Sequence, residues 1–139
     1  LDMEIAELMA SVDDPGLYVL DYVPNASADA IDQVGEHFFR RIRDAHPEVP
    51  VVFIEDVIFP HTIFDNKILE EVTKKNVAQK RLFKKLKQSG EKRIYYISAE
   101  GMIGDDGEAT VDAIHFTDLG AMRYVDHVLP LIKRALRCH

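Results

Sequence analysis

The hydrophobic residues follow two patterns along the chain, and the first of these patterns predicts strands. Residues 17–20, 50–54 and 94–97 are short, nearly continuous apolar runs bounded by turn or polar residues. Such runs are typical of strands that are buried on both faces of a parallel sheet. We therefore predict three buried strands at these positions.

The second pattern spaces apolar residues three and four positions apart and predicts four helices. These cover residues 2–11, 27–46, 66–89 and the chain from 117 onward. Ser27 and Thr117 are suitable N-caps, and Pro130 predicts a bend near Asp126 in the last helix. The faces that we expect to be buried carry Ile5, Leu8, Met9 and Val12 in the first helix, Ile31, Val34, Phe38, Ile42 and Ala45 in the second, and Met122, Val125, Leu129, Ile132 and Leu136 in the last.

The alternation of helices and strands predicts an α/β fold, a three-layer α/β/α sandwich with parallel strands and right-handed crossovers. Ligands of such sheets bind beyond the carboxyl ends of the strands. Three strands are few for this architecture, and no strand precedes the first predicted helix. We therefore expect a domain that is incomplete at its N-terminal side, with sequence before Leu1 supplying at least one more strand.

The composition narrows the class of protein. The 139 residues, 47% of them hydrophobic, suffice for one globular domain or slightly less. A formal net charge of -7 disfavours nucleic-acid binding, and we interpret the basic cluster in residues 80–87 as a solvated helix face. No apolar run approaches the roughly 20 residues that span a bilayer. The only cysteine, Cys138, excludes an intrachain disulfide and leaves the compartment undetermined.

The best candidate for chemistry is an Asp and a His three residues apart, just before the last helix. A carboxylate that holds one ring nitrogen of a histidine leaves the other nitrogen free to take a proton. Asp112 could hold His115 in this way, and both residues belong to a long loop, residues 98–116, of the kind that is often functional. The alternative is that Asp112 only turns the chain and His115 fills space before the N-cap Thr117.

Further candidates follow the other two predicted strands, so all of them should meet at one edge of the sheet. Asn25 follows the first strand, where it could also form an Asx-turn after Pro24. His61 follows the second strand and could line a pocket, although a surface histidine is more often merely polar. His61, His115 and His127 lack the spacing of metal ligands, and we expect no metal or other cofactor.

Two stretches resemble the SGNH, or GDSL-type, hydrolases. Residues 111–120, VDAIHFTDLG, are similar to the last block of that family, D-x-x-H followed by Pro and a helix. Residues 20–25, LDYVPN, stand where the family has the oxyanion-hole block that ends in Asn. The resemblance extends over residues 1–139 and is greatest to the bacterial GDSL-like lipase/acylhydrolase type. It implies a flavodoxin-like sheet and a serine esterase of which this chain is the C-terminal portion of a single domain.

The resemblance also implies roles for the candidate residues. His115 would be the base, Asp112 its carboxylate partner and Asn25 an oxyanion-hole donor, acting on O-acyl esters of small molecules, carbohydrates or lipids. Phe116 stands in place of the family's Pro, and Asn25 follows Pro24 rather than standing in G-x-N-D. No G-D-S or G-x-S-x-G sequence occurs, so the nucleophilic serine would lie upstream and the 139-residue chain alone should be inactive. The resemblance favours export and leaves the oligomeric state open.

Two other classes of protein stay open at this point. A phosphoacceptor receiver domain would use Asp21 as the acceptor, with Asp13 and Asp14 as its acid pair, although no lysine follows the third strand. A binding module would use the same acidic edge of the sheet without chemistry.

Overall fold

The three predicted strands form one parallel sheet in the order β1-β2-β3. A computed structural model describes residues 1–137 of the chain, apart from the side chain of Ile63, so Cys138 lies outside the described residues. The strands are β1 (Tyr18–Leu20), β2 (Val51–Ile54) and β3 (Ile94–Ile97). The helices are α1 (Met3–Ala10), α2 (Ala28–Ala45), α3 (Asn66–Gln88) and α4 (Asp118–Arg137), with two short 3-10 helices, η1 (Val23–Asn25) and η2 (Pro60–Phe64).

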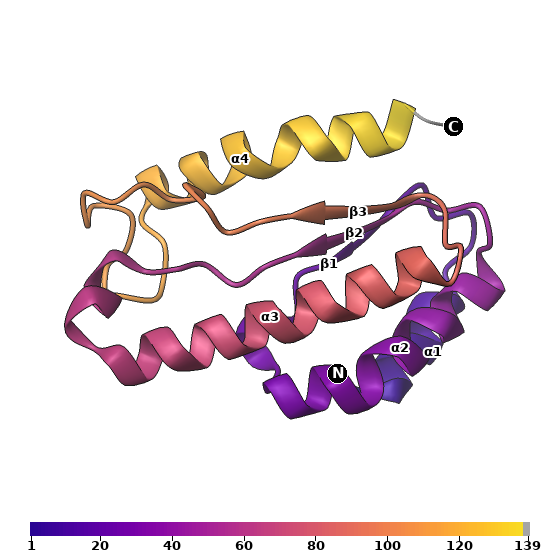
Figure 1. Cartoon of the computed structure of the whole chain (residues 1–139). Helices are drawn as coiled ribbons and strands as arrows, with labels where there is room; N and C mark the ends of the chain where they lie inside the picture. Colours follow the sequence, from indigo (N-terminus) through magenta and orange to yellow (C-terminus); the bar gives the residue numbers. More distant parts are fainter. Residues whose placement is uncertain (138–139) are drawn as a thin grey trace.

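The sheet lies between two layers of helices, as predicted (Figure 1). Helix α4 covers one face, and α1, α2 and α3 lie on the other face. Backbone pairing sets Tyr18 beside Val51 and Val51 beside Ile94, so all three strands run in the same direction and end at the same edge. The loops that carry the candidate residues leave from this edge.

Side-chain caps fix where the helices begin. Ser27 Oγ accepts a hydrogen bond from Ala30 N at 3.1 Å, and Thr117 Oγ1 accepts one from Gly120 N at 3.1 Å, so both predicted N-caps are confirmed. Asp65 caps α3 through Lys67 N at 3.1 Å. Helix α4 continues through Pro130 as one helix.

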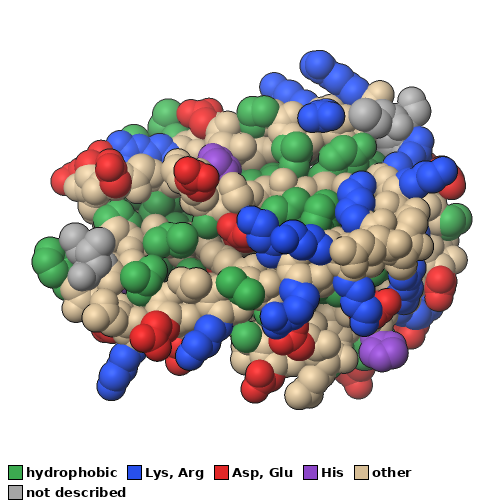
Figure 2. All heavy atoms as spheres, in the orientation of Figure 1, with side chains coloured by type: hydrophobic (Ala, Val, Ile, Leu, Met, Phe, Trp, Pro, Cys, Tyr) green, Lys and Arg blue, Asp and Glu red, His purple; other side chains and the backbone are tan. Residues whose placement is uncertain are grey.

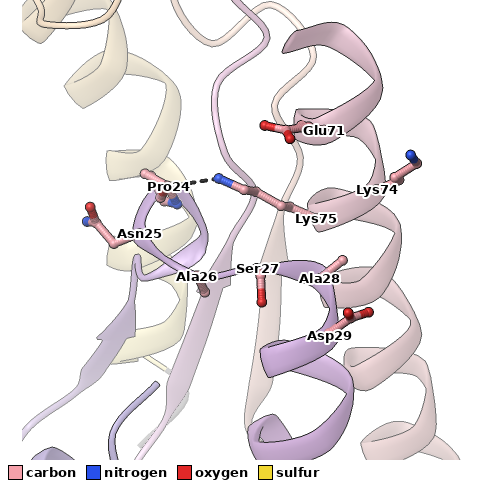
Figure 3. Close-up of a pocket in the computed structure, with 9 residues that line it drawn as sticks. All are labelled: Pro24, Asn25, Ala26, Ser27, Ala28, Asp29, Glu71, Lys74 and Lys75. Carbon is pink, nitrogen blue, oxygen red and sulfur yellow. Dashed lines mark hydrogen bonds between the residues drawn. The ribbon is translucent and has the colours of Figure 1, made fainter. Parts of the chain in front are cut away.

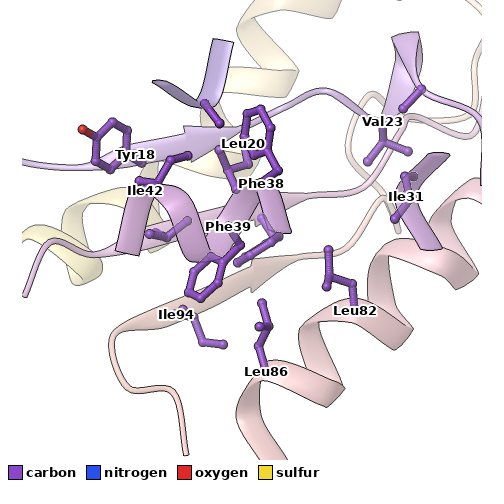
Figure 4. Close-up of a cluster of buried hydrophobic side chains, with 14 of the residues drawn as sticks. Tyr18, Leu20, Val23, Ile31, Phe38, Phe39, Ile42, Leu82, Leu86 and Ile94 are labelled. Atoms are coloured by element: carbon purple, nitrogen blue, oxygen red, sulfur yellow. The ribbon is translucent and has the colours of Figure 1, made fainter. Parts of the chain in front are cut away.

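The larger core lies between the sheet and the α2 and α3 side (Figure 4). Phe39 of α2 stacks at 5.7 Å from Phe53 of β2, and Leu86 of α3 is fully buried beside them. Gly35 lets these two helices approach closely, since a Cβ there would stand 2.7 Å from a methyl group of Leu82. A second, smaller core fills the space between the sheet and α4.

The buried face of α1 differs from the prediction. Leu8 is 64% exposed and Ile5 and Val12 are also exposed, whereas Ala6 and Ala10 are buried. Helix α1 packs on α2, and small alanine side chains allow the two helices to approach. Met9 of the predicted face is partly buried against the larger core, and it forms the packed face together with Ala6 and Ala10, which have the same three-and-four spacing.

The face of α4 that we predicted to be buried is also largely wrong. The prediction that β1 is buried on both faces is likewise wrong. Met122 is 64% exposed and Val125 and Leu136 are exposed, whereas Val128 and Ala135 are buried and Ile132 packs beside them. Helix α4 packs mainly on β2 and β3. Val19 on β1 is therefore 41% exposed in the described structure.

The basic residues of α3 lie on a solvated face, as predicted. Arg81 Nη2 lies 2.6 Å from Asp32 Oδ2, and Lys85 Nζ lies 2.6 Å from Glu36 Oε2, so carboxylates of α2 balance part of the positive charge. Figure 2 shows Lys and Arg side chains gathered mainly over the right half of the molecule, with Asp and Glu among them. None of the helices in residues 1–137 is long and apolar enough to cross a membrane.

Close packing of Gly120 against the preceding loop gives the first prediction. A Cβ at Gly120 would stand 2.0 Å from the carbonyl oxygen of Ala109, so Gly120→Ala must push α4 away from the loop that carries Asp112 and His115. We expect the free energy of unfolding to fall by about 1–3 kcal/mol, measured by thermal or chemical denaturation. Gly16→Ala is the matched control, because a Cβ there meets nothing within 4 Å. Equal stability of the two variants would contradict this account.

Candidate active site

The loops after all three strands meet around one cavity of about 150 Å³ at the carboxyl edge of the sheet. Pro24 belongs to the loop after β1, and Ile114 and Phe116 to the loop after β3. The other lining residues are Asp21, Glu55, Asp56, Val57, Phe59 and Tyr124. The neighbours of Asn25 and His115 thus line a common cavity, as expected for a sheet of parallel strands.

The loop before α4 is folded back on itself and presents Asp112 and His115 at its tip. Thr110 and Phe116 form an antiparallel bridge, and Val111 N donates to His115 O at 2.9 Å. Ala113 has φ +72°, a left-handed conformation that reverses the chain between the two residues. The two arms of the loop therefore hold the D-x-x-H segment in a compact turn.

Asp112 both turns the chain and binds the imidazole of His115. Its Oδ1 accepts hydrogen bonds from Ile114 N at 3.0 Å and His115 N at 2.7 Å. Its Oδ2 lies 2.6 Å from His115 Nδ1, which is the predicted contact. With the Nδ1 proton directed at the carboxylate, Nε2 is the nitrogen that can accept a proton. The turn and the carboxylate–imidazole contact, which were alternatives from sequence, occur together.

The same hydrogen bonds lower the pKa of Asp112 to about 2. The largest cause is the bond from the backbone N–H of His115, followed by the bond to its ring and the bond from Ile114 N. Both side chains are open to solvent, with 52% of Asp112 and 77% of His115 exposed. Asp112 is therefore a carboxylate throughout the neutral pH range.

Asn25 ends η1 and does not line this cavity; together with Pro24 it lines a separate pocket against α3. Its backbone N–H donates to Tyr22 O at 3.0 Å, and its exposed side chain makes no hydrogen bond within residues 1–137. Figure 3 shows the Asn25 amide pointing away from α3. An Asx-turn, the alternative from sequence, is thus not formed, and the amide is free to donate to a ligand.

Glu55, which the sequence did not single out, lines the cavity together with Asp21 and Tyr124. Glu55 accepts hydrogen bonds from Tyr96 Oη at 2.6 Å and Ala99 N at 2.8 Å, which joins the loops after β2 and β3. Asp21 accepts from Tyr124 Oη at 2.6 Å. Burial raises the pKa of Tyr96, and the bond to Glu55 raises it further. The position of Glu55 directly after a strand was the only signal in the sequence.

Asp56, beside Glu55, is buried in the loop after β2. Burial raises the pKa of its carboxyl, while the positive charge of Lys75 acts in the opposite direction. The side-chain amide of Asn76, on α3, fixes the backbone of Asp56. It accepts a hydrogen bond from Asp56 N at 2.8 Å and donates one to Asp56 O at 2.8 Å.

The two other histidines considered from the sequence, His61 and His127, lie outside this arrangement. His61, in η2, has its ring centroid 5.8 Å from that of Phe59 and does not line the cavity. His127 Nε2 bonds the carbonyl of Ser98 at 2.8 Å. Within residues 1–137, no group of three His, Cys, Asp or Glu side chains is placed to hold a metal ion.

The geometry does not suit a receiver domain. Asp13 and Asp14 precede β1, whereas Asp21 follows it, so the presumed acid pair and the acceptor lie at opposite ends of the strand. Three residues of strand separate the two ends by about 10 Å. The carboxylate of Asp21 is also bound by Tyr124.

Comparison with known proteins bears on the family of the chain. The model of the GDSL-like lipase/acylhydrolase family matches residues 1–133. The chain belongs to this family. The crystal structure of a Bacteroides ovatus protein, described as a GDSL-like lipase, is 31% identical in sequence to the chain and superposes on 98% of it with a TM-score of 0.92. No curated protein matches the chain by sequence.

Two more distant structures share the fold. The salicylyl-acyltransferase SsfX3 of a tetracycline biosynthetic pathway is 16% identical over 94% of the chain, with a TM-score of 0.71. The family 3 carbohydrate esterase of Clostridium thermocellum is 14% identical over 95%, with a TM-score of 0.63. The GDSL-like chain described here spans 40% of the Bacteroides protein, 41% of SsfX3 and 66% of the esterase.

The hydrogen bonds of Asp112 predict how its pKa responds to loss of His115. In His115→Ala the backbone N–H of residue 115, the largest cause of the lowered pKa, remains, so the pKa should rise only part of the way from about 2 to its ordinary value. Because this pKa is lowered in the folded state, the stabilisation is present above about pH 4 and is lost as the pH falls through about 2. Carboxyl ¹³C NMR titration measures both values.

Asp106 is the control for this titration, because Arg123 holds it at 2.7 Å and His115 does not contact it. Its pKa should be the same in both proteins. A wild-type Asp112 that titrates near its ordinary value would show that the turn is not formed in solution.

Proposed function

We propose that this chain is part of a serine ester hydrolase in which Asp112 and His115 are two members of the catalytic triad and Asn25 is an oxyanion-hole donor. The observation that carries the proposal is the 2.6 Å contact between Asp112 Oδ2 and His115 Nδ1, at the sheet edge where Asn25 also lies. Membership of the GDSL-like lipase/acylhydrolase family supports ester hydrolysis. The substrates are O-acyl esters of carbohydrates or lipids.

In this proposal His115 Nε2 removes the proton from a serine hydroxyl as its oxygen attacks the ester carbonyl. Asp112 stabilises the imidazolium that forms. The side-chain N–H of Asn25 donates to the carbonyl oxygen as it becomes negative. The imidazolium then protonates the departing alcohol, and water, activated by the same histidine, hydrolyses the acyl-enzyme.

The serine comes from outside the 139 residues in this proposal. The serines of the chain, Ser11, Ser27, Ser89 and Ser98, do not stand in the sharp strand-to-helix turn that exposes a nucleophile. Further polypeptide of the same domain would pair with the open edge of β1 and cover Val19 and Met122, which are exposed. The greater length of the structural relatives supports this arrangement.

Removal of the proposed base gives the central test. In the complete protein, His115→Ala should lower kcat for a p-nitrophenyl ester by several orders of magnitude, because the serine loses its proton acceptor. His37→Ala, an exposed histidine of α2, is the control and should retain full activity. A His115→Ala protein that is folded and keeps kcat within about tenfold of wild type would exclude His115 as the base.

Two substitutions at Asn25 test the oxyanion role. Asn25→Ala should lower kcat by roughly 10²- to 10³-fold with little change in KM, because the donor acts mainly on the charge that develops in the transition state. Asn25→Asp should be at least as damaging, since it places a carboxylate beside the oxyanion. A merely structural turn residue would tolerate Asp, so measuring kcat, KM and Tm of both variants decides between the two roles.

A further inference from the structure

The turn that carries Asn25 is held in place from α3. Lys75 Nζ donates a hydrogen bond to the carbonyl of Pro24 at 3.0 Å, drawn as a dashed line in Figure 3. One turn further along the same helix, Gln79 Oε1 accepts a hydrogen bond from Tyr22 Oη at 2.6 Å. The two bonds of α3 thus join residues immediately before and within η1.

The turn has few bonds of its own. Asn25 N donates to Tyr22 O at 3.0 Å and Ala26 N donates to Val23 O at 3.2 Å. Such 3-10 bonds have poorer geometry than those of an α-helix, and a single turn is too short to fix its own direction. The orientation of the Asn25 side chain therefore depends on contacts from outside the turn.

The bond from Lys75 is well placed to fix this orientation. The Pro24 carbonyl belongs to the same planar peptide unit as the backbone nitrogen of Asn25. An ammonium group that holds this carbonyl therefore holds the plane from which the Asn25 side chain projects. Lys75 is partly buried, and its positive charge also acts on the buried carboxyl of Asp56.

We infer that Lys75 is a positioning residue for ester hydrolysis: through the Pro24 carbonyl it holds the Asn25 amide where the oxyanion forms. This inference rests on the proposed role of Asn25. In this inference Lys75 does not contact the substrate, and it affects kcat only through the position of Asn25. A displacement of about 1 Å in a catalytic group can cost as much as 10²-fold in rate, so loss of a single supporting bond should be measurable.

The neighbouring Lys74 provides a matched control. Its side chain is exposed and points away from η1 in Figure 3, and its one ion-pair partner among the described residues is Glu70, at 4.0 Å. Lys74→Met and Lys75→Met remove the same charge from adjacent positions of one helix. They differ in whether the bond to Pro24 is lost, so their comparison separates positioning from the general effect of a positive charge near the site.

The experiment measures kcat, KM and Tm of the complete protein with a p-nitrophenyl ester. We expect Lys75→Met to lower kcat by about tenfold with KM nearly unchanged, and Lys74→Met to remain within about twofold of wild type. Lys75→Arg, which keeps a cationic donor, should recover part of the loss. In the Asn25→Ala background, Lys75→Met should cause no further loss of kcat, because the group that it positions is absent.

The outcomes separate this inference from the proposed function. If Asn25→Ala lowers kcat as proposed but Lys75→Met does not, or lowers it equally in both backgrounds, Lys75 does not position Asn25 and the proposed function stands. If Asn25→Ala has normal kcat, the oxyanion assignment itself fails, and the inference fails with it. An equal loss in Lys74→Met and Lys75→Met would show a general charge effect. Should Lys75→Met not fold, the comparison of Lys75→Arg with wild type in the two Asn25 backgrounds gives the same decision.

Discussion

The site depends on hydrogen bonds that fix the three loops leaving the carboxyl ends of the strands. A parallel sheet brings these loops to one edge but does not determine their conformations. Asn76 fixes the loop after β2 by binding both backbone groups of Asp56, and Glu55 joins that loop to Ala99, at the start of the loop after β3. Buried donors and acceptors that lose their partners are costly, so these bonds restrict each loop to one arrangement.

Helix α4 fixes the other end of the loop that carries the candidate base. Its first turn is capped by Thr117, whose backbone N–H also donates to Ala109 O at 3.0 Å. Arg123 lies further along α4, and its guanidinium donates to the carbonyl of Ile103 at 3.0 Å and to both carboxylate oxygens of Asp106. The loop is long, but it is bonded to α4 at several places, so His115 is presented from a supported turn.

Much of the fold could be predicted from local pattern, because strands, caps and the D-x-x-H turn depend on residues close in sequence. Ser27 capped its helix as predicted, and Asp112 met His115 three residues away. The buried faces predicted for α1 and α4 were largely wrong, because each helix carries two apolar stripes. The spacing of the residues alone does not say which stripe packs against the rest of the protein. The bond between Tyr22 and Gln79 spans 57 residues and has no local signal. For the same reason, the support that α3 gives to Asn25 could be found only in three dimensions.

The exposure of the Asp112–His115 pair bears on how the proposed enzyme would work. Charges that interact through water attract weakly, and the same pair attracts more strongly once water is excluded. Val111, just before the pair, and Ile114, between its two members, are exposed apolar side chains, and Phe116 lines the adjacent cavity. In the proposed enzyme, an acyl or alcohol group seated against these side chains would displace water from the imidazole. Substrate binding would then strengthen the carboxylate–imidazole interaction at the moment when the histidine must take a proton.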